Sequence, residues 1–275
     1  MEINLAFAFA LTTLAGLSTG IGSAAAYFIR TPRYSYLALM LGFSAGVMVY
    51  ISFTELLGTA IEDIGFATAN IAFFVGILFI AVIDMLVPHQ YEEEHSAGVR
   101  SDIRRQAEQQ GETGASTQLT GSPQSPLMRS GLFMALGIAI HNFPEGMVTF
   151  SSAATGDVTL GIVIAVAIAI HNIPEGIVVS VPIFYATGDR RKAFTYSFLS
   201  GVAEPVGAVI GYAILSPFLT PALLSSSLAF VAGIMVYISL DEILPLAHRY
   251  GKENVVLVGI GAGMLVMAVS LFLLR

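Results

Sequence analysis

Eight long apolar segments dominate this chain and leave few folds open to it. Each contains about 20 or more mostly apolar residues, the length that an α-helix needs to cross a bilayer. The composition agrees, since 55% of the residues are hydrophobic and only 11% are charged, against about 25% charged in soluble domains. We therefore predict an all-α membrane protein with eight transmembrane helices. The predicted spans are residues 4–29, 35–60, 66–88, 129–153, 157–185, 193–217, 222–248 and 254–274.

The connections between these spans differ in length and charge. Residues 89–128 combine clustered charges with Gln, Ser, Gly and Pro, so we predict a flexible loop there, within a single transmembrane domain over residues 1–275. With eight spans, eleven of the twelve basic residues fall on one side, and Arg275 is the exception. The positive-inside rule then places the long loop in the cytoplasm and both termini outside.

A hexapeptide occurs twice, as HNFPEG from residue 141 and as HNIPEG from residue 171, near the middle of the fourth and fifth spans. Ionisable side chains inside a membrane are costly to bury, so they need a partner. In each copy His and Glu are four residues apart and share one helix face. Two such faces together supply two imidazoles and two carboxylates, a ligand set that suits a divalent transition metal such as Zn²⁺. These candidate ligands are His141, Glu145, His171 and Glu175.

A second repeat relates residues 45–60 to residues 232–247, with ten of the sixteen positions identical. These segments fall in the second and seventh spans, which cross the membrane in opposite directions. Both repeats are explained by one inverted repeat arranged 3+2+3, a pattern typical of transporters with a site at the midplane. Chance similarity of apolar stretches is the alternative, but the identical Tyr, Ser and Glu positions argue against it.

Several classes of function are disfavoured. The chain has no Cys, which excludes disulfides and thiolate ligands. Its few basic residues form no stripe on a soluble domain, so we expect no nucleic-acid partner. No HExxH motif is present, although an intramembrane metal hydrolase stays open as an alternative that would need an open metal position and a separate acid or base. A passive metal channel with the same site is a second alternative.

The eight spans, the long loop after the third and the paired HNxPEG motifs resemble the ZIP family of divalent metal transporters, in particular its bacterial zinc-uptake branch. This resemblance implies a multi-pass protein of the bacterial inner membrane, embedded in the lipid bilayer and commonly a homodimer. It implies no enzymatic reaction and no cofactor. Zn²⁺ would be the transported substrate, with Fe²⁺, Mn²⁺, Co²⁺ and Cd²⁺ as related cargoes. Access would alternate as spans one, four, five and six move against the other four.

The resemblance also implies a site for two metals. Asn142 and Asn172 would line the second position together with Glu204 in the sixth span, and Glu145 and Glu175 would bridge both positions. A lone carboxylate hydrogen-bonded to a neighbouring helix is the alternative for Glu204. Four other acidic residues lie towards span ends, where solvation by water and attraction of cations are both open interpretations. They are Glu55, Asp84, Asp241 and Glu242.

Overall fold

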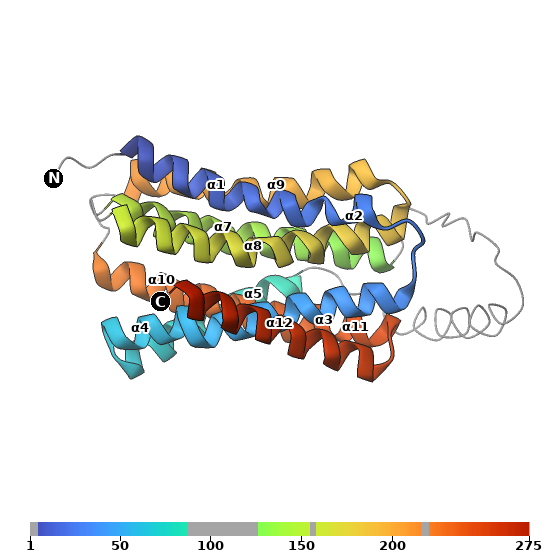
Figure 1. Cartoon of the computed structure of the whole chain (residues 1–275). Helices are drawn as coiled ribbons and strands as arrows, with labels where there is room; N and C mark the ends of the chain where they lie inside the picture. Colours follow the sequence, from blue (N-terminus) through green and yellow to red (C-terminus); the bar gives the residue numbers. More distant parts are fainter. Residues whose placement is uncertain (1–4, 87–125, 155–157, 216–219, 275) are drawn as a thin grey trace, which may run out of the picture.

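The computed structural model describes residues 5–86, 126–154, 158–215 and 220–274, and every regular element in these ranges is helical (Figure 1). The elements labelled η are short π-helical segments that continue an α-helix. In chain order the elements are α1 (Leu5–Ser23), α2 (Ala25–Phe28), α3 (Tyr34–Ile51), η1 (Ser52–Leu56), α4 (Leu57–Ile64), α5 (Phe66–Leu86), α7 (Pro126–Ala154), α8 (Val158–Thr187), α9 (Arg190–Ile210), η2 (Gly211–Leu215), α10 (Pro221–Ile238), η4 (Ser239–Ile243), α11 (Leu244–Tyr250) and α12 (Glu253–Leu274).

Seven helical stretches in the described ranges are long and apolar enough to cross a membrane, which supports a multi-pass membrane protein. α7 is not among the seven, although it is 29 residues long. α8 carries an equivalent hexapeptide and is among them, so the difference comes from the residues around the motif, which are less apolar in α7 than in α8. The predicted span boundaries agree with the helix ends to within four residues. Residues 89–125 of the predicted loop lie outside the described residues, whereas 126–128 belong to α7, which starts with a proline.

The long helices form two layers (Figure 1). In what we call the first layer, α1, α7, α8 and α9 pack against one another with the short α2 beside them. In the second layer, α3 packs on α12 and α5 packs on α10, and α4 and α11 extend the longer helices. The main contacts between the layers join α3 to α8 and α10 to α7. The fold is therefore two helical groups that meet along one interface.

The turns that carry the basic residues gather at one end of the bundle. These are the turns after α2, α8 and α11, at the right of Figure 1, and we call this the basic end. The turn after α8 is built by two residues suited to it. Gly188 adopts a φ of 69°, which glycine tolerates without strain. Asp189 Oδ1 then accepts hydrogen bonds from the backbone N–H groups of Arg191 (2.9 Å) and Lys192 (3.1 Å), which starts α9.

The helices of the second layer repeat with a constant spacing of 187 residues (221 against 34, 239 against 52, 244 against 57 and 253 against 66). This spacing relates α10 to α3, η4 to η1, α11 to α4 and α12 to α5. The sequence match between residues 45–60 and 232–247 is therefore part of a longer structural correspondence. Both copies carry a π-helical segment at the same place, and such segments occur often at functional sites.

Glycines allow α3 and α12 to pack with their backbones in close contact. A Cβ atom at Gly263 would lie 2.0 Å from the carbonyl oxygen of Phe43, and one at Gly46 would lie 2.2 Å from that of Ile260. Such distances are far below a normal contact, so no larger residue fits without moving a helix. Small residues at helix interfaces replace the missing hydrophobic driving force inside a bilayer with close van der Waals packing.

We predict that Gly263→Ala destabilises the protein by about 1–3 kcal/mol, the usual cost of overpacking, and lowers the unfolding temperature in detergent. Gly261→Ala is the matched control, because a Cβ atom there meets no described atom within 4 Å. That control should leave the unfolding temperature unchanged or raise it slightly, since alanine favours helix. Equal unfolding temperatures for the two variants would contradict the close packing of α3 and α12.

Candidate metal centre

The two hexapeptides lie near the middle of α7 and α8, which are neighbouring helices of the first layer. Both helices continue through the motif prolines, Pro144 and Pro174. All seven candidate ligands are buried, with exposed fractions of 0% for six of them and 2% for Glu145. They are His141, Asn142 and Glu145 on α7, His171, Asn172 and Glu175 on α8, and Glu204 on α9.

Each histidine pairs with the glutamate of the other hexapeptide. His141 Nε2 lies 2.8 Å from Glu175 Oε1, and His171 Nε2 lies 2.6 Å from Glu145 Oε1. The sequence predicted that His and Glu share a face within each helix, and the structure brings those two faces together. The pairing is reciprocal, so neither carboxylate is buried without a partner, which would be very costly.

Three of the four predicted His and Glu ligands converge on one point. One ligand atom from each of His141, Glu145 and Glu175 lies within 4.8 Å of the other two. His171 reaches this group through its contact with Glu145. Neutral imidazole nitrogens and carboxylate oxygens are ligands for Zn²⁺. The arrangement therefore offers a mixed nitrogen and oxygen donor set in a buried position.

Several donor and acceptor atoms of the cluster are left without a hydrogen bond within the described residues. They are His141 Nδ1, Glu145 Oε2, Asn172 Oδ1 and Glu204 Oε1. Buried polar atoms are normally satisfied, and each exception needs an explanation such as an ion or water. Three of the four are oxygen acceptors, so a cation is the partner that suits them best.

Asn142 is placed to join the cluster around His141. Its amide can be rotated by half a turn, which exchanges oxygen and nitrogen. In one orientation the amide nitrogen donates to His141 Nε2 at 2.9 Å and to Glu175 Oε2 at 3.2 Å. In the other orientation the amide oxygen takes that place and the nitrogen makes a long contact of 3.4 Å to the carbonyl of Ser200. The second orientation suits a cation, because it directs three acceptors towards one another.

Glu204 and Asn172 form a second group beside the first. Asn172 Nδ2 donates to Glu204 Oε2 at 2.7 Å and to the carbonyl oxygen of Ala15 at 3.0 Å. The carbonyls of Ala15 and Ser200 thus position the two asparagines. These two contacts could not be predicted from the sequence, because every residue has a backbone carbonyl and no residue type indicates which one accepts.

The last residue of each hexapeptide is a glycine, and it allows a neighbouring helix, α9 or α1, to pack close to the site. A Cβ atom at Gly146 would lie 1.9 Å from the carbonyl oxygen of Glu204. A Cβ atom at Gly176 would lie 2.2 Å from the carbonyl oxygen of Thr19. Glycine at these positions lets the backbones touch, which brings Glu204 next to the ligands of α7 and α8.

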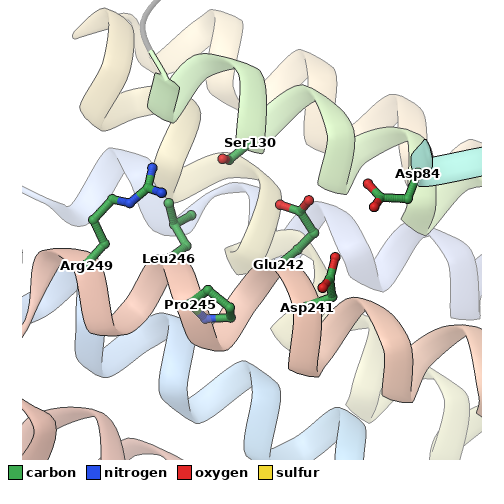
Figure 2. Close-up of a pocket in the computed structure, with 7 residues that line it drawn as sticks. All are labelled: Asp84, Ser130, Asp241, Glu242, Pro245, Leu246 and Arg249. Atoms are coloured by element: carbon green, nitrogen blue, oxygen red, sulfur yellow. The ribbon is translucent and has the colours of Figure 1, made fainter. Parts of the chain in front are cut away.

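A partly open acidic pocket of about 330 Å³ lies beside Arg249 in the last turn of α11 (Figure 2). Asp84, Asp241 and Glu242 line it, and one carboxylate oxygen from each lies within 4.8 Å of the other two. Ser130 from α7 faces these second-layer residues across the pocket, so the pocket lies between the layers. Asp84 also accepts a hydrogen bond of 3.2 Å from Tyr237. The structure therefore brings together three of the four acidic residues that the sequence left open, and Glu55 is not among them.

Comparisons with a family model and with individual proteins identify the same family. A family model described as "ZIP Zinc transporter" matches residues 69–271. The chain is 52% identical to the zinc transporter ZupT of Nitratidesulfovibrio vulgaris, over 98% of each chain. It is 51% identical to the zinc transporter ZupT of Clostridium perfringens, over 98% of this chain and 96% of the relative. It is 54% identical to that of Chlorobium phaeovibrioides, over 96% of both chains.

We predict that Zn²⁺ raises the unfolding temperature of the purified protein and that His141→Ala removes most of this rise. A ligand that binds only the folded state stabilises it by about 2.7 kcal/mol at a concentration of 100 times Kd. His248→Ala is the matched control, because His248 is exposed on α11, outside the buried cluster. An equal Zn²⁺ effect in both variants would place the binding site elsewhere.

Proposed function

Because the chain belongs to the ZIP zinc transporter family, we propose that it transports Zn²⁺ across the bacterial inner membrane into the cytoplasm. The observation that supports this most is the buried convergence of His141, Glu145 and Glu175, with His171 paired to Glu145. The members of the family are transporters rather than enzymes, so the hydrolase alternative is not retained. Zn²⁺ is the cargo here, and no cofactor takes part in the proposal.

The proposed site holds two metals. His141, His171, Glu145 and Glu175 would bind the first ion. Asn142, Asn172 and Glu204 would line the second position, with Glu145 and Glu175 shared between the two. The amide oxygens are neutral, so the second position should bind more weakly. Fe²⁺, Mn²⁺, Co²⁺ and Cd²⁺ are further cargoes in this proposal, because nitrogen and oxygen ligands bind many divalent metals in an order set largely by the metal.

The proposed topology has eight spans, with α7 as the fourth, arranged as a 3+2+3 inverted repeat. The clustering of basic residues at one end supports a cytoplasmic basic end, with both termini outside. The long segment between α5 and α7 would then face the cytoplasm. Exposed apolar side chains on α5 and α12, such as Phe74 (61%) and Phe272 (79%), suit contact with lipid or with a second copy in a homodimer.

The proposed mechanism is alternating access, in which the first layer moves against the second. All seven candidate ligands belong to α7, α8 and α9, so the site would move as one body with the first layer. Asp241 and Glu242 would attract cations at the inner mouth, and Glu55 would do so at the outer mouth. Carboxylates in a funnel with low-dielectric walls concentrate cations, and salt weakens this effect.

Transport assays with purified protein in liposomes test the function. We predict that His171→Ala and Glu175→Ala abolish Zn²⁺ uptake while the protein still inserts, because each removes a ligand of the tighter position. Glu204→Gln should reduce uptake less and leave one tightly bound Zn²⁺ per chain. Uptake should also fall as the pH drops through the His range, since bound imidazole must be neutral.

Counting bound Zn²⁺ in each variant provides the control. Loss of all metal from Glu204→Gln, with full occupancy in His171→Ala, would reverse the assignment of the two positions. Uptake that never saturates as Zn²⁺ is raised would favour the passive channel over alternating access.

Single-cysteine labelling tests the topology, and the chain has no cysteine of its own to remove. Lys252 and Ala222 are exposed near opposite ends of the bundle, after α11 and at the start of α10. We predict that an impermeant maleimide reagent outside intact cells labels the Ala222→Cys variant and spares Lys252→Cys. Labelling of Lys252→Cys from outside, with Ala222→Cys protected, would invert the proposed orientation.

A further inference from the structure

A buried hydrogen bond ties the two layers together at the second hexapeptide. Ser44 Oγ on α3 donates to the carbonyl oxygen of Pro174 on α8, at 3.0 Å. The exposed fraction of Ser44 is 0%. This carbonyl belongs to the peptide bond that joins Pro174 to Glu175. The Ser44 hydroxyl therefore connects the second layer to the backbone of a candidate metal ligand in the first.

The register of α3 shows which of its faces meets the first layer. Cβ atoms at Gly42 and Gly46 would lie against the backbones of Val256 and Ile260, so this face packs on α12. Ser44 lies two positions after Gly42 and two before Gly46, so it projects to the opposite side of the helix. Met48 lies one turn beyond Ser44, on the same side and away from the basic end, and its exposed fraction is 0%.

Within the described residues, the position of α10 that corresponds to Ser44 offers no matching hydrogen bond. The spacing of 187 residues that relates α10 to α3 places Val231 at the position of Ser44 (231 against 44). Val231 is buried, with an exposed fraction of 1%, and its side chain has no donor. The Pro144–Glu145 peptide of the first hexapeptide therefore lacks a serine partner at the corresponding position of α10.

We propose that Ser44 is a positioning residue that stabilises the observed arrangement of the layers over its alternative. This inference rests on the proposed alternating access. In the observed arrangement the acidic pocket beside Arg249 is partly open and Met48 is covered. In an inverted repeat the opposite arrangement exchanges the roles of α3 and α10, so Val231 takes the place of Ser44 and cannot donate. The hydrogen bond is then present in one arrangement and lost in the other.

The test measures how often the covered face of α3 becomes accessible. Met48→Cys is introduced into the full-length protein, and its maleimide labelling rate is compared among Ser44, Ser44→Ala, Ser44→Thr and Ser44→Val. Thr and Val have nearly the same shape and differ in the hydroxyl, so this pair separates the hydrogen bond from side-chain volume. We expect Met48→Cys to be labelled about two- to tenfold faster in Ser44→Ala than with Ser44 intact, and about two- to tenfold faster in Ser44→Val than in Ser44→Thr. This range of rates corresponds to the net free energy of one hydrogen bond.

A second probe separates a shift between arrangements from general loosening. Ser130 lines the pocket that is open in the observed arrangement, so the labelling of Ser130→Cys should not rise in Ser44→Val. Equal Met48→Cys rates in the Thr and Val backgrounds would overturn the proposal. A parallel rise at both probes would also overturn it, because that result means local disorder.

A transport assay separates the role of the Ser44 hydroxyl from Zn²⁺ transport itself. Zn²⁺ uptake is measured in the Met48→Cys and Ser130→Cys proteins before labelling, with Ser44 intact. If both proteins take up Zn²⁺ but Met48→Cys is labelled at the same rate in all Ser44 variants, the role of Ser44 is wrong and the transport proposal is unaffected. Absence of uptake in both proteins, with the labelling difference present, would count against transport and leave the hydrogen bond as a tie between the layers.

Discussion

The reciprocal pairing of buried histidines and glutamates is the interaction on which the rest of the structure depends. His141 lies 2.8 Å from Glu175, and His171 lies 2.6 Å from Glu145, with all four side chains buried. Isolated carboxylates could not stay charged at such depth. Each helix therefore requires the other, and α7 and α8 must lie side by side at this register. The glycines that follow the ligands then allow α9 and α1 to pack directly against the paired helices.

The sequence predicted the ends of the helices closely, but it did not predict the contacts between them. Span lengths and the charged turns predicted helix ends to within four residues, because apolar length and turn chemistry are local properties. The hexapeptides identified His141, Glu145, His171 and Glu175, since ionisable residues stand out in apolar segments. The exchange of partners between helices, and the meeting of Asp84 with Asp241, depend on packing between distant segments. No residue spacing encodes such contacts.

The helices of the second layer repeat with a constant spacing, but the two sides of the buried cluster in the first layer are not chemically equal. A Cβ atom at Gly16 would lie 3.1 Å from Glu204 Cβ, and one at Gly201 would lie 2.7 Å from Thr19 Cβ. Thr19 on α1 therefore occupies the place that corresponds to Glu204 on α9, in a spacing of 185 residues (204 against 19 and 201 against 16). A carboxylate is present on one side of the cluster and a hydroxyl on the other, so only one side would add a charge to the proposed second position.

The division of labour between the layers follows from where these polar groups lie. Every candidate ligand belongs to the first layer, so in the proposed alternating access a relative movement of the layers would change the access to the site without changing its donor set. Among the described residues, the second layer contributes acidic residues near its helix ends and a serine hydroxyl bonded to a candidate ligand's backbone. Alternating access requires two arrangements of the layers whose free energies differ by only a few kcal/mol. A net hydrogen bond contributes about 0.5–1.5 kcal/mol, so the Ser44 hydroxyl would change the ratio of two such arrangements by about two- to tenfold.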